Sequence, residues 1–256
     1  PVVFLQDTIL NNAESLAKQY AGSITLGMGQ FCTNPGLMLA IDGDGLDHFL
    51  QSLSKEMETV VPAKMLHTGI HKAYFEKMEA ALGEKGVSLL SRSTAVPAAM
   101  EALPTIAVVE GNIFRQDPLL HEEVFGPYSL LVKCKDIEEL KAVWRSLAGQ
   151  LTTTLMGTDK DFKDHSSLLD IAPSIAGRIV FNGVPTGVEV CPSMVHGGPF
   201  PASTDSRFTA VGINAVKRWV RPVCYQNCPA DLFPDALKDG NPLGIWRLVN
   251  NEWLKD

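Results

Sequence analysis

The sequence has no excess of positive charge. Its 22 Lys and Arg residues are outnumbered by 29 Asp and Glu residues, so the formal net charge at pH 7 is −7. Proteins that bind nucleic acids gather Lys and Arg against the phosphate backbone, and no such basic patch occurs in this sequence. We therefore expect no nucleic-acid partner.

Long apolar runs are also lacking. No stretch approaches the roughly 18 consecutive apolar residues of a membrane-spanning helix, and the first residues lack the basic start and apolar core of a signal peptide. Hydrophobic residues make up 45% of the 256 residues and charged residues 20%, as is ordinary for a soluble globular protein. We expect a cytoplasmic protein with no membrane partner, built as one large domain or two small ones.

Cysteine is scarce, and its positions do not suggest disulfide pairs. The five cysteines are an odd number spread along the chain, at Cys32, Cys134, Cys191, Cys224 and Cys228. A chain of this length lies outside the class of small disulfide-stapled proteins, so a reducing compartment fits best. Structural zinc would need a second ligand pair to match Cys224 and Cys228, and none has the required spacing. We predict no metal site.

The motifs of several nucleotide-binding and hydrolase classes are missing. Gly27 and Gly29 begin a dinucleotide-binding pattern, but the third glycine of that pattern is absent. No phosphate-binding loop with a following Lys and Ser or Thr occurs, and neither does Gly-x-Ser-x-Gly. These absences exclude a P-loop nucleotide site and the nucleophile turn of the serine hydrolases.

Short apolar runs alternate with amphipathic stretches along the chain. The predicted strands cover residues 2–5, 37–41, 87–91, 105–110, 128–133, 152–156, 177–182 and 219–225. The predicted helices cover residues 8–22, 24–28, 46–60, 67–82, 137–147 and 160–169, with a short helix within 203–218. Strands that alternate with helices predict an α/β fold, with a largely parallel sheet and flanking helices. We expect the tail over 226–256 to be mainly irregular.

One cysteine lies in a stretch of turn-forming residues, Gly27–Gly36. Cys32 comes just before Pro35 and Gly36, on a loop or helix end of the kind that often carries reactive groups. Cysteine is the strongest side-chain nucleophile near neutral pH. The alternative is a small buried hydrophobic residue, which is the more common role of a free cysteine. Cys32 is the candidate nucleophile.

The six histidines supply candidate partners for Cys32. His67 and His71 share a helical face, but no Glu follows His67 as a zinc-protease motif would demand. We interpret these two as residues of a solvated helix face. His196 lies in a long Gly- and Pro-rich segment, 183–201, and long loops in compact domains are often functional. It is the histidine that we retain.

Three motifs occur in a fixed order: GQFCT at 29–33, EVFGP at 123–127 and VFNG at 180–183. In this order and spacing they resemble the aldehyde dehydrogenase superfamily. The stretches CTNPG at 32–36, GGPFPASTDSRFTAVG at 197–212 and RWVRPVCYQNCP at 218–229 resemble one branch, the 2,5-dioxopentanoate (alpha-ketoglutaric semialdehyde) dehydrogenases. The resemblance covers nearly the whole chain, but only the C-terminal half of such an enzyme.

The resemblance implies a role for several residues. Cys32 matches the nucleophile, which attacks an aldehyde to form a thiohemiacetal; NAD or NADP then takes a hydride, and water cleaves the resulting thioester. Glu123 matches the residue that hydrogen-bonds the nicotinamide ribose, although without the resemblance it would be interpreted as part of a solvated loop end. Phe125 matches the aromatic residue beside the nicotinamide. The residues implied to line the aldehyde site are Phe31, Thr33 and His196.

The resemblance also implies how the chain is organised. Residues 1–215 would form the nucleophile-bearing catalytic domain, and residues 216–256 a C-terminal strand and tail that joins a partner subunit in a homo-oligomer. The chain begins at Pro1 inside a predicted strand, so we expect a fragment of a longer polypeptide that carries the cofactor domain and the general base. We expect this fragment alone to be inactive.

Two alternatives stay open at this point. The first is a cofactor-free thiol hydrolase or acyltransferase that uses Cys32 with a histidine. The second is a non-catalytic structural or oligomerisation unit. Rapid alkylation of Cys32 relative to the other four cysteines favours a catalytic function, because reactive cysteines are activated by their surroundings.

Overall fold

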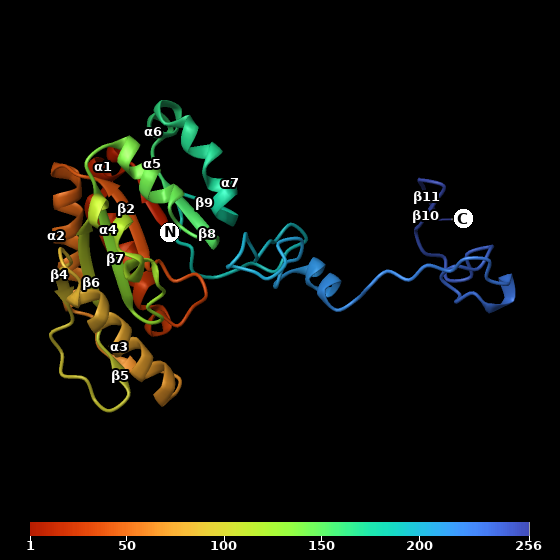
Figure 1. The fold of residues 1–256 in the computed structure, drawn as a ribbon, viewed down its shortest axis with the longest axis horizontal. Helices are drawn as coiled ribbons and strands as arrows, with labels where there is room; N and C mark the ends of the chain where they lie inside the picture. Colours follow the sequence, from red (N-terminus) through yellow and green to blue (C-terminus); the bar gives the residue numbers. More distant parts are fainter. Residues whose placement is uncertain (256) are drawn as a thin grey trace. The chain divides into compact units, whose positions relative to one another are not determined.

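The computed structural model describes residues 1–255, which fall into two units. The first unit is Pro1–Arg218 and the second begins at Trp219. The boundary predicted from the sequence lay between residues 215 and 216. The large sheet, its helices and Cys32 all belong to the first unit (Figure 1).

The first unit is built on a seven-stranded sheet with the strand order β4-β6-β7-β2-β1-β8-β9. All neighbouring strands are parallel except β4 and β6, which are antiparallel. The strands are β1 (Val2–Phe4), β2 (Leu37–Ile41), β4 (Ser88–Arg92), β6 (Thr105–Glu110), β7 (Tyr128–Cys134), β8 (Gln150–Met156) and β9 (Ala176–Phe181). The predicted α/β fold with a largely parallel sheet is confirmed.

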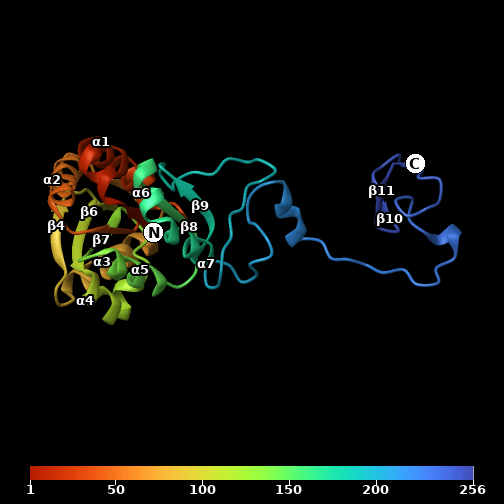
Figure 2. The same cartoon turned by 90° about the horizontal axis from the view of Figure 1, so that it is seen from above.

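Helices cover both faces of this sheet, as the view in Figure 2 shows. Helices α1 (Gln6–Thr25) and α2 (Asp44–Glu58) pack on one face, where they share an apolar core with β1. In α2, apolar residues recur every three or four positions, which gives the helix one buried face. The opposite face is covered by α3 (Thr68–Gly83), α4 (Gly111–Gln116), α5 (Ile137–Arg145), α6 (Asp159–Asp164) and α7 (Ala172–Ile175).

Strand β1 lies between β2 and β8 in the sheet and is buried on both sides. Val2 and Phe4 belong to the core under α1 and α2, whereas Val3 belongs to the core on the opposite face. Because successive side chains of a strand point to opposite faces, a strand covered on both faces is apolar throughout. This explains why the first residues of the chain are a continuous apolar run.

The direction of the strands positions the candidate site. The Cys32 loop precedes β2, the Glu123–Gly126 segment precedes β7, and Gly149 precedes β8. Since these strands are parallel, their amino ends meet at one edge of the sheet. In open α/β sheets ligands commonly bind at the opposite, carboxyl edge, so the sheet alone would not have indicated this location.

Several predicted elements differ in detail. The helix predicted over 160–169 is interrupted at His165, where α6 gives way to a 3₁₀ segment, η3 (Ser166–Asp170). The short helix expected within 203–218 is a 3₁₀ segment, η4 (Ile213–Arg218). The short antiparallel pair of β3 (Ala63–Lys64) and β5 (Glu101–Ala102) was not predicted.

The strand predicted over 219–225 does not form within residues 1–255. No strand is assigned there, and apolar side chains such as Trp219 and Val220 are exposed. A strand forms by pairing its backbone with a neighbour, and within residues 1–255 this run has none. The tail instead contains a hairpin of β10 (Arg247–Val249) and β11 (Glu252–Leu254).

Among residues 1–255, no helix combines the length and the apolar character needed to cross a membrane.

Candidate active site

The Cys32 loop leaves α1 through a turn that requires glycine. The 3₁₀ turn η1 (Leu26–Gly29) has left-handed φ angles of 54° at Gly27, 55° at Met28 and 64° at Gly29, a region that glycine enters at little cost. A Cβ atom on Gly29 would lie 2.2 Å from the carbonyl oxygen of Gly126. Glycine therefore lets the Cys32 loop touch the loop that precedes β7.

Side-chain hydrogen bonds fix the loop on either side of Cys32. The amide Nδ2 of Asn34 donates to the carbonyl oxygen of Gly126 at 3.0 Å. The hydroxyl of Thr33 donates to the carbonyl oxygen of Pro185 at 2.8 Å. Cys32 itself is exposed, so it presents its thiol from a loop that is held by its neighbours.

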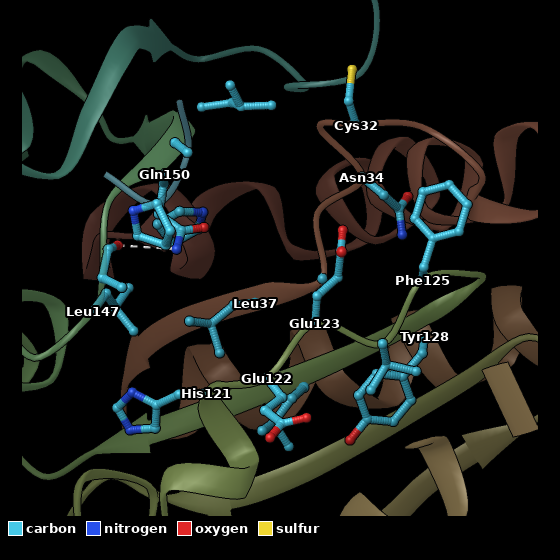
Figure 3. Close-up of a pocket in the computed structure, with 18 of the residues that line it drawn as sticks. Cys32, Asn34, Leu37, His121, Glu122, Glu123, Phe125, Tyr128, Leu147 and Gln150 are labelled. Carbon is cyan, nitrogen blue, oxygen red and sulfur yellow. Dashed lines mark hydrogen bonds between the residues drawn. The ribbon is translucent and has the colours of Figure 1, made fainter. Parts of the chain in front are cut away.

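A pocket of about 490 Å³ opens at the amino edge of the sheet, and Cys32, Glu123 and Phe125 are among its lining residues. Figure 3 shows the Glu123 side chain extending from its loop into the pocket, below Cys32 and Asn34. Among residues 1–255 the Glu123 carboxylate has no hydrogen-bond or ion-pair partner; only the backbone carbonyl of Glu123 is engaged, by the Lys77 ammonium at 3.2 Å. The carboxylate is thus free to accept hydrogen bonds from a ligand.

His196 contacts the cysteine sulfur. Its Nε2 atom lies 3.2 Å from Sγ of Cys32, and the histidine is only 7% exposed. Its backbone is fixed by Thr209, whose Oγ1 accepts from the His196 N–H at 2.7 Å, and by the N–H of Ala210, which donates to the His196 carbonyl at 2.9 Å. Burial, and next the positive charge of Arg178, lower the pKa of His196 below its usual 6.5, which favours the neutral imidazole.

Arg178, in β9, was not singled out from the sequence. Its two terminal nitrogens donate to the carbonyl oxygens of Gly187, at 3.0 Å, and Pro185, at 2.6 Å. Among residues 1–255 no carboxylate is paired with its guanidinium. Burial lowers the pKa of Arg178, and the nearby Cys32 acts in the opposite direction. An arginine whose partners are backbone carbonyls carries no signature in the sequence.

The remaining predicted site residues lie in different surroundings. Phe31 lines the pocket with Cys32. Thr33 is buried and turns its hydroxyl to Pro185, and neither Thr33 nor His196 is part of the pocket lining. Cys32 therefore has the pocket on one side and His196 as a separate contact. Within the described part of the chain, no three His, Cys, Asp or Glu residues are grouped as metal ligands.

Known proteins with similar sequences indicate the family to which this site is related. No protein-family model matches the chain. The alpha-ketoglutaric semialdehyde dehydrogenase of Acinetobacter baylyi is 41% identical over 251 residues, a match that covers 98% of this chain and 48% of that protein. The alpha-ketoglutaric semialdehyde dehydrogenase 2 of Azospirillum brasilense is 42% identical over 248 residues, covering 97% and 47%. The chain is a relative of the aldehyde dehydrogenases. It spans about half the length of the curated relatives it matches.

Solved structures show the same fold. The gamma-glutamyl-gamma-aminobutyraldehyde dehydrogenase from Burkholderia cenocepacia superposes with a TM-score of 0.67 at 20% identity, over 85% of this chain and 43% of that one. The succinic semialdehyde dehydrogenase from Streptococcus pyogenes, solved in complex with NADP+, gives 0.63 at 19% identity, over 77% and 43%. The resemblance inferred from the three sequence motifs is confirmed, and the first unit has the fold of an aldehyde dehydrogenase catalytic domain.

Proposed function

We propose that the protein carrying this chain oxidises an aldehyde to a carboxylate, with NAD or NADP as the hydride acceptor. One observation supports this most strongly: an exposed cysteine lines the same pocket as the unpartnered Glu123 carboxylate and Phe125. The aldehyde is alpha-ketoglutaric semialdehyde or a similar semialdehyde, a proposal supported by 41% identity to an enzyme named for it.

In the proposed reaction Cys32 provides the nucleophile. Its sulfur forms a bond to the aldehyde carbon, and the carbonyl electron pair moves to the oxygen, which gives a thiohemiacetal. The backbone N–H of Cys32 has no acceptor among residues 1–255, so it is free to donate a hydrogen bond to that oxygen. Loss of a hydride leaves a thioester on Cys32, and water releases the carboxylate.

The residues of the pocket fit one side of a nicotinamide cofactor. The Glu123 carboxylate has unused acceptor capacity for ribose hydroxyls, and Phe125 supplies an apolar ring for the edge of a planar heterocycle. The bound cofactor supplies the hydride acceptor. NADP+ in the related Streptococcus pyogenes structure supports a cofactor of this class.

We further propose that turnover needs more polypeptide than these 256 residues. The chain spans 48% of its Acinetobacter baylyi relative, and the rest of such an enzyme would carry the remaining cofactor contacts and the glutamate that activates water. We also propose a homo-oligomer in which the exposed apolar run 219–225 pairs with a partner subunit. An unpaired apolar segment of this kind suits strand addition.

The test uses the longest polypeptide that carries this sequence. Alpha-ketoglutaric semialdehyde is supplied with NAD or NADP, and the reduced cofactor is followed by its absorbance. We expect Cys32→Ala to abolish turnover and leave cofactor binding intact, while Cys224→Ala, which removes an exposed cysteine of the second unit, stays active. Turnover retained in Cys32→Ala would contradict the proposal.

A second candidate function is favoured by one specific contact. The 3.2 Å approach of His196 Nε2 to Cys32 Sγ is the arrangement of a thiol hydrolase or acyltransferase. Such an enzyme would cleave a thioester or activated ester without NAD or NADP and would not oxidise the semialdehyde. Ester cleavage together with no aldehyde-dependent cofactor reduction would establish this second function in place of the first.

A further inference from the structure

The contact between Cys32 and His196 differs from a cysteine–histidine pair that is supported by a carboxylate or amide. In such sites a third polar group accepts a hydrogen bond from the second imidazole nitrogen and orients the ring. Here Nδ1 of His196 is buried and has no hydrogen-bond partner among residues 1–255. The imidazole is held instead through its backbone, by Thr209 and Ala210.

The charged group near the Cys32–His196 pair is the guanidinium of Arg178. The carbonyl oxygen of Pro185 accepts hydrogen bonds from both the Arg178 guanidinium, at 2.6 Å, and the Thr33 hydroxyl, at 2.8 Å. A single oxygen atom therefore connects Arg178 to the residue that follows Cys32 in the chain. A second bond to the carbonyl of Gly187 fixes the plane of the guanidinium, and this fork geometry is specific to arginine.

This arrangement has an electrostatic consequence. A positive charge near the pair disfavours a second positive charge on His196. Among residues 1–255, Cys32 and Arg178 are the titratable or charged groups that contact His196 or act on it. The neutral form of the His196 imidazole is thus favoured, and its Nε2 atom can receive a proton.

We propose that His196 takes the proton of the Cys32 thiol as the sulfur attacks its substrate, and that Arg178 is the positioning residue that holds the Cys32 loop against the imidazole. The S–H bond breaks, a bond from hydrogen to Nε2 forms, and the sulfur electron pair makes the new C–S bond. The imidazolium then passes its proton to water, because Arg178 disfavours a second cation. The step serves the aldehyde oxidation proposed above.

The proposal is tested by the alkylation rate of Cys32 with iodoacetamide between pH 5 and 9, followed by mass spectrometry of the Cys32 peptide. Alkylation requires neither aldehyde nor cofactor, so its outcome is independent of whether the oxidation proposed above is correct. The variants are His196→Gln, His196→Asn, Arg178→Gln and Arg178→Lys. The matched control is His48→Gln, which removes an exposed histidine of α2 whose neighbour is Glu14.

We expect His196→Gln to slow alkylation at pH 7 by about tenfold, because the thiol then lacks the group that receives its proton. His196→Asn should slow alkylation to a similar extent, and this variant provides the test of His196 if His196→Gln fails to fold. Arg178→Gln should shift the His196 inflection of the profile to higher pH, whereas Arg178→Lys, which keeps the charge and loses the fork, should keep the inflection and lower the rate.

Two results would overturn the proposal. If the folded His196 variants react as the unmodified protein and His48→Gln do across the pH range, His196 does not take the thiol proton. If the profile of Arg178→Gln coincides with that of the unmodified protein, Arg178 does not position the pair. Circular dichroism and thermal unfolding of every variant separate these outcomes from loss of structure.

Discussion

Replacing Gly29 by Ala tests whether the Cys32 loop depends on its close approach to the loop before β7. Gly29 has φ of +64°, and an added Cβ atom would lie 2.2 Å from the Gly126 carbonyl oxygen. Alanine in the left-handed region costs roughly 1–2 kcal/mol. The carbonyl must also move by about 1 Å to restore an ordinary contact, since real Cβ atoms essentially never approach closer than 3.0 Å.

That movement is resisted by the hydrogen bonds of the Gly126 carbonyl. It accepts from Asn34 Nδ2 at 3.0 Å and from the Tyr128 N–H at 2.8 Å, and each such bond contributes about 1 kcal/mol. Together these terms give an expected loss of about 2–4 kcal/mol in the free energy of unfolding. In a protein of this size each kcal/mol corresponds to about 2–4 °C, so the expected fall in Tm is about 4–16 °C.

The matched control is Gly22→Ala. Gly22 lies within α1, and a Cβ atom there would meet nothing within 4 Å, so the alanine should raise stability by up to about 1 kcal/mol. Urea unfolding followed by circular dichroism compares the two variants, and Cys32 alkylation reports whether the loop has moved. If Gly29→Ala is as stable as Gly22→Ala and its Cys32 is alkylated at the unchanged rate, the Cys32 loop does not depend on the close approach of Gly29 to Gly126.

Three further outcomes are expected. Asp161 is buried and its carboxylate accepts N–H bonds at the start of both α1 and α6, so Asp161→Ala should lower the free energy of unfolding by about 3 kcal/mol or more. As the control, Asp159→Ala removes an exposed carboxylate of α6 and should lower the free energy of unfolding by under about 1 kcal/mol. Equal losses for the two variants in urea unfolding would exclude a special role for Asp161. Burial raises the pKa of Cys134 to about 12, so iodoacetamide at pH 8 should label it last among the cysteines; early labelling in the folded protein would contradict its burial. The hairpin turn has φ of +68° at Asn251, a conformation that valine strongly disfavours and glycine adopts easily. Asn251→Val should therefore abolish the β10–β11 amide pairing, measured by NMR, whereas Asn251→Gly should retain it. A hairpin retained in the Val variant would show that the turn does not depend on the residue at position 251.

Most of the sheet could be predicted from the sequence because its strands are short apolar runs between turn signals. The strand over 105–110 has the predicted bounds, Thr105–Glu110, and its apolar residues are buried or half-buried because both faces of the sheet are covered. The run over 219–225 is also rich in apolar residues but forms no strand within residues 1–255. Composition indicates that a segment can pair, and the formation of a strand also requires a neighbouring backbone.

The tail contains strands that were not predicted from the sequence. Its hairpin is short, with exposed side chains, so hydrophobic alternation is weak there. A local signal was nevertheless available, because Asn250 and Asn251 both adopt positive φ between the strands, and asparagine is a favoured non-glycine residue in such turns. The Asn250-Asn251 pair is therefore a local sequence signal for this hairpin turn.

Some residues of the candidate site could be selected from the sequence and one could not. Cys32 and His196 could be selected from the sequence because one lies in a motif with glycine and proline around it and the other in a long glycine-rich segment. Arg178 could not, because its role depends on two backbone carbonyls of the segment after β9. The direction of a carbonyl is set by the path of the chain and leaves no residue type as a marker.

In the proposed reaction, Cys32 forms a covalent thioester during aldehyde oxidation. The most direct measurement mixes the longest polypeptide carrying this sequence with alpha-ketoglutaric semialdehyde and NAD or NADP, quenches the reaction in acid within the first turnover, and maps the modified peptide by mass spectrometry. We expect the acyl group on the peptide that contains Cys32, and no such peptide when the cofactor is omitted. An acyl group on another residue, or oxidation of the aldehyde by the Cys32→Ala variant, would contradict the account.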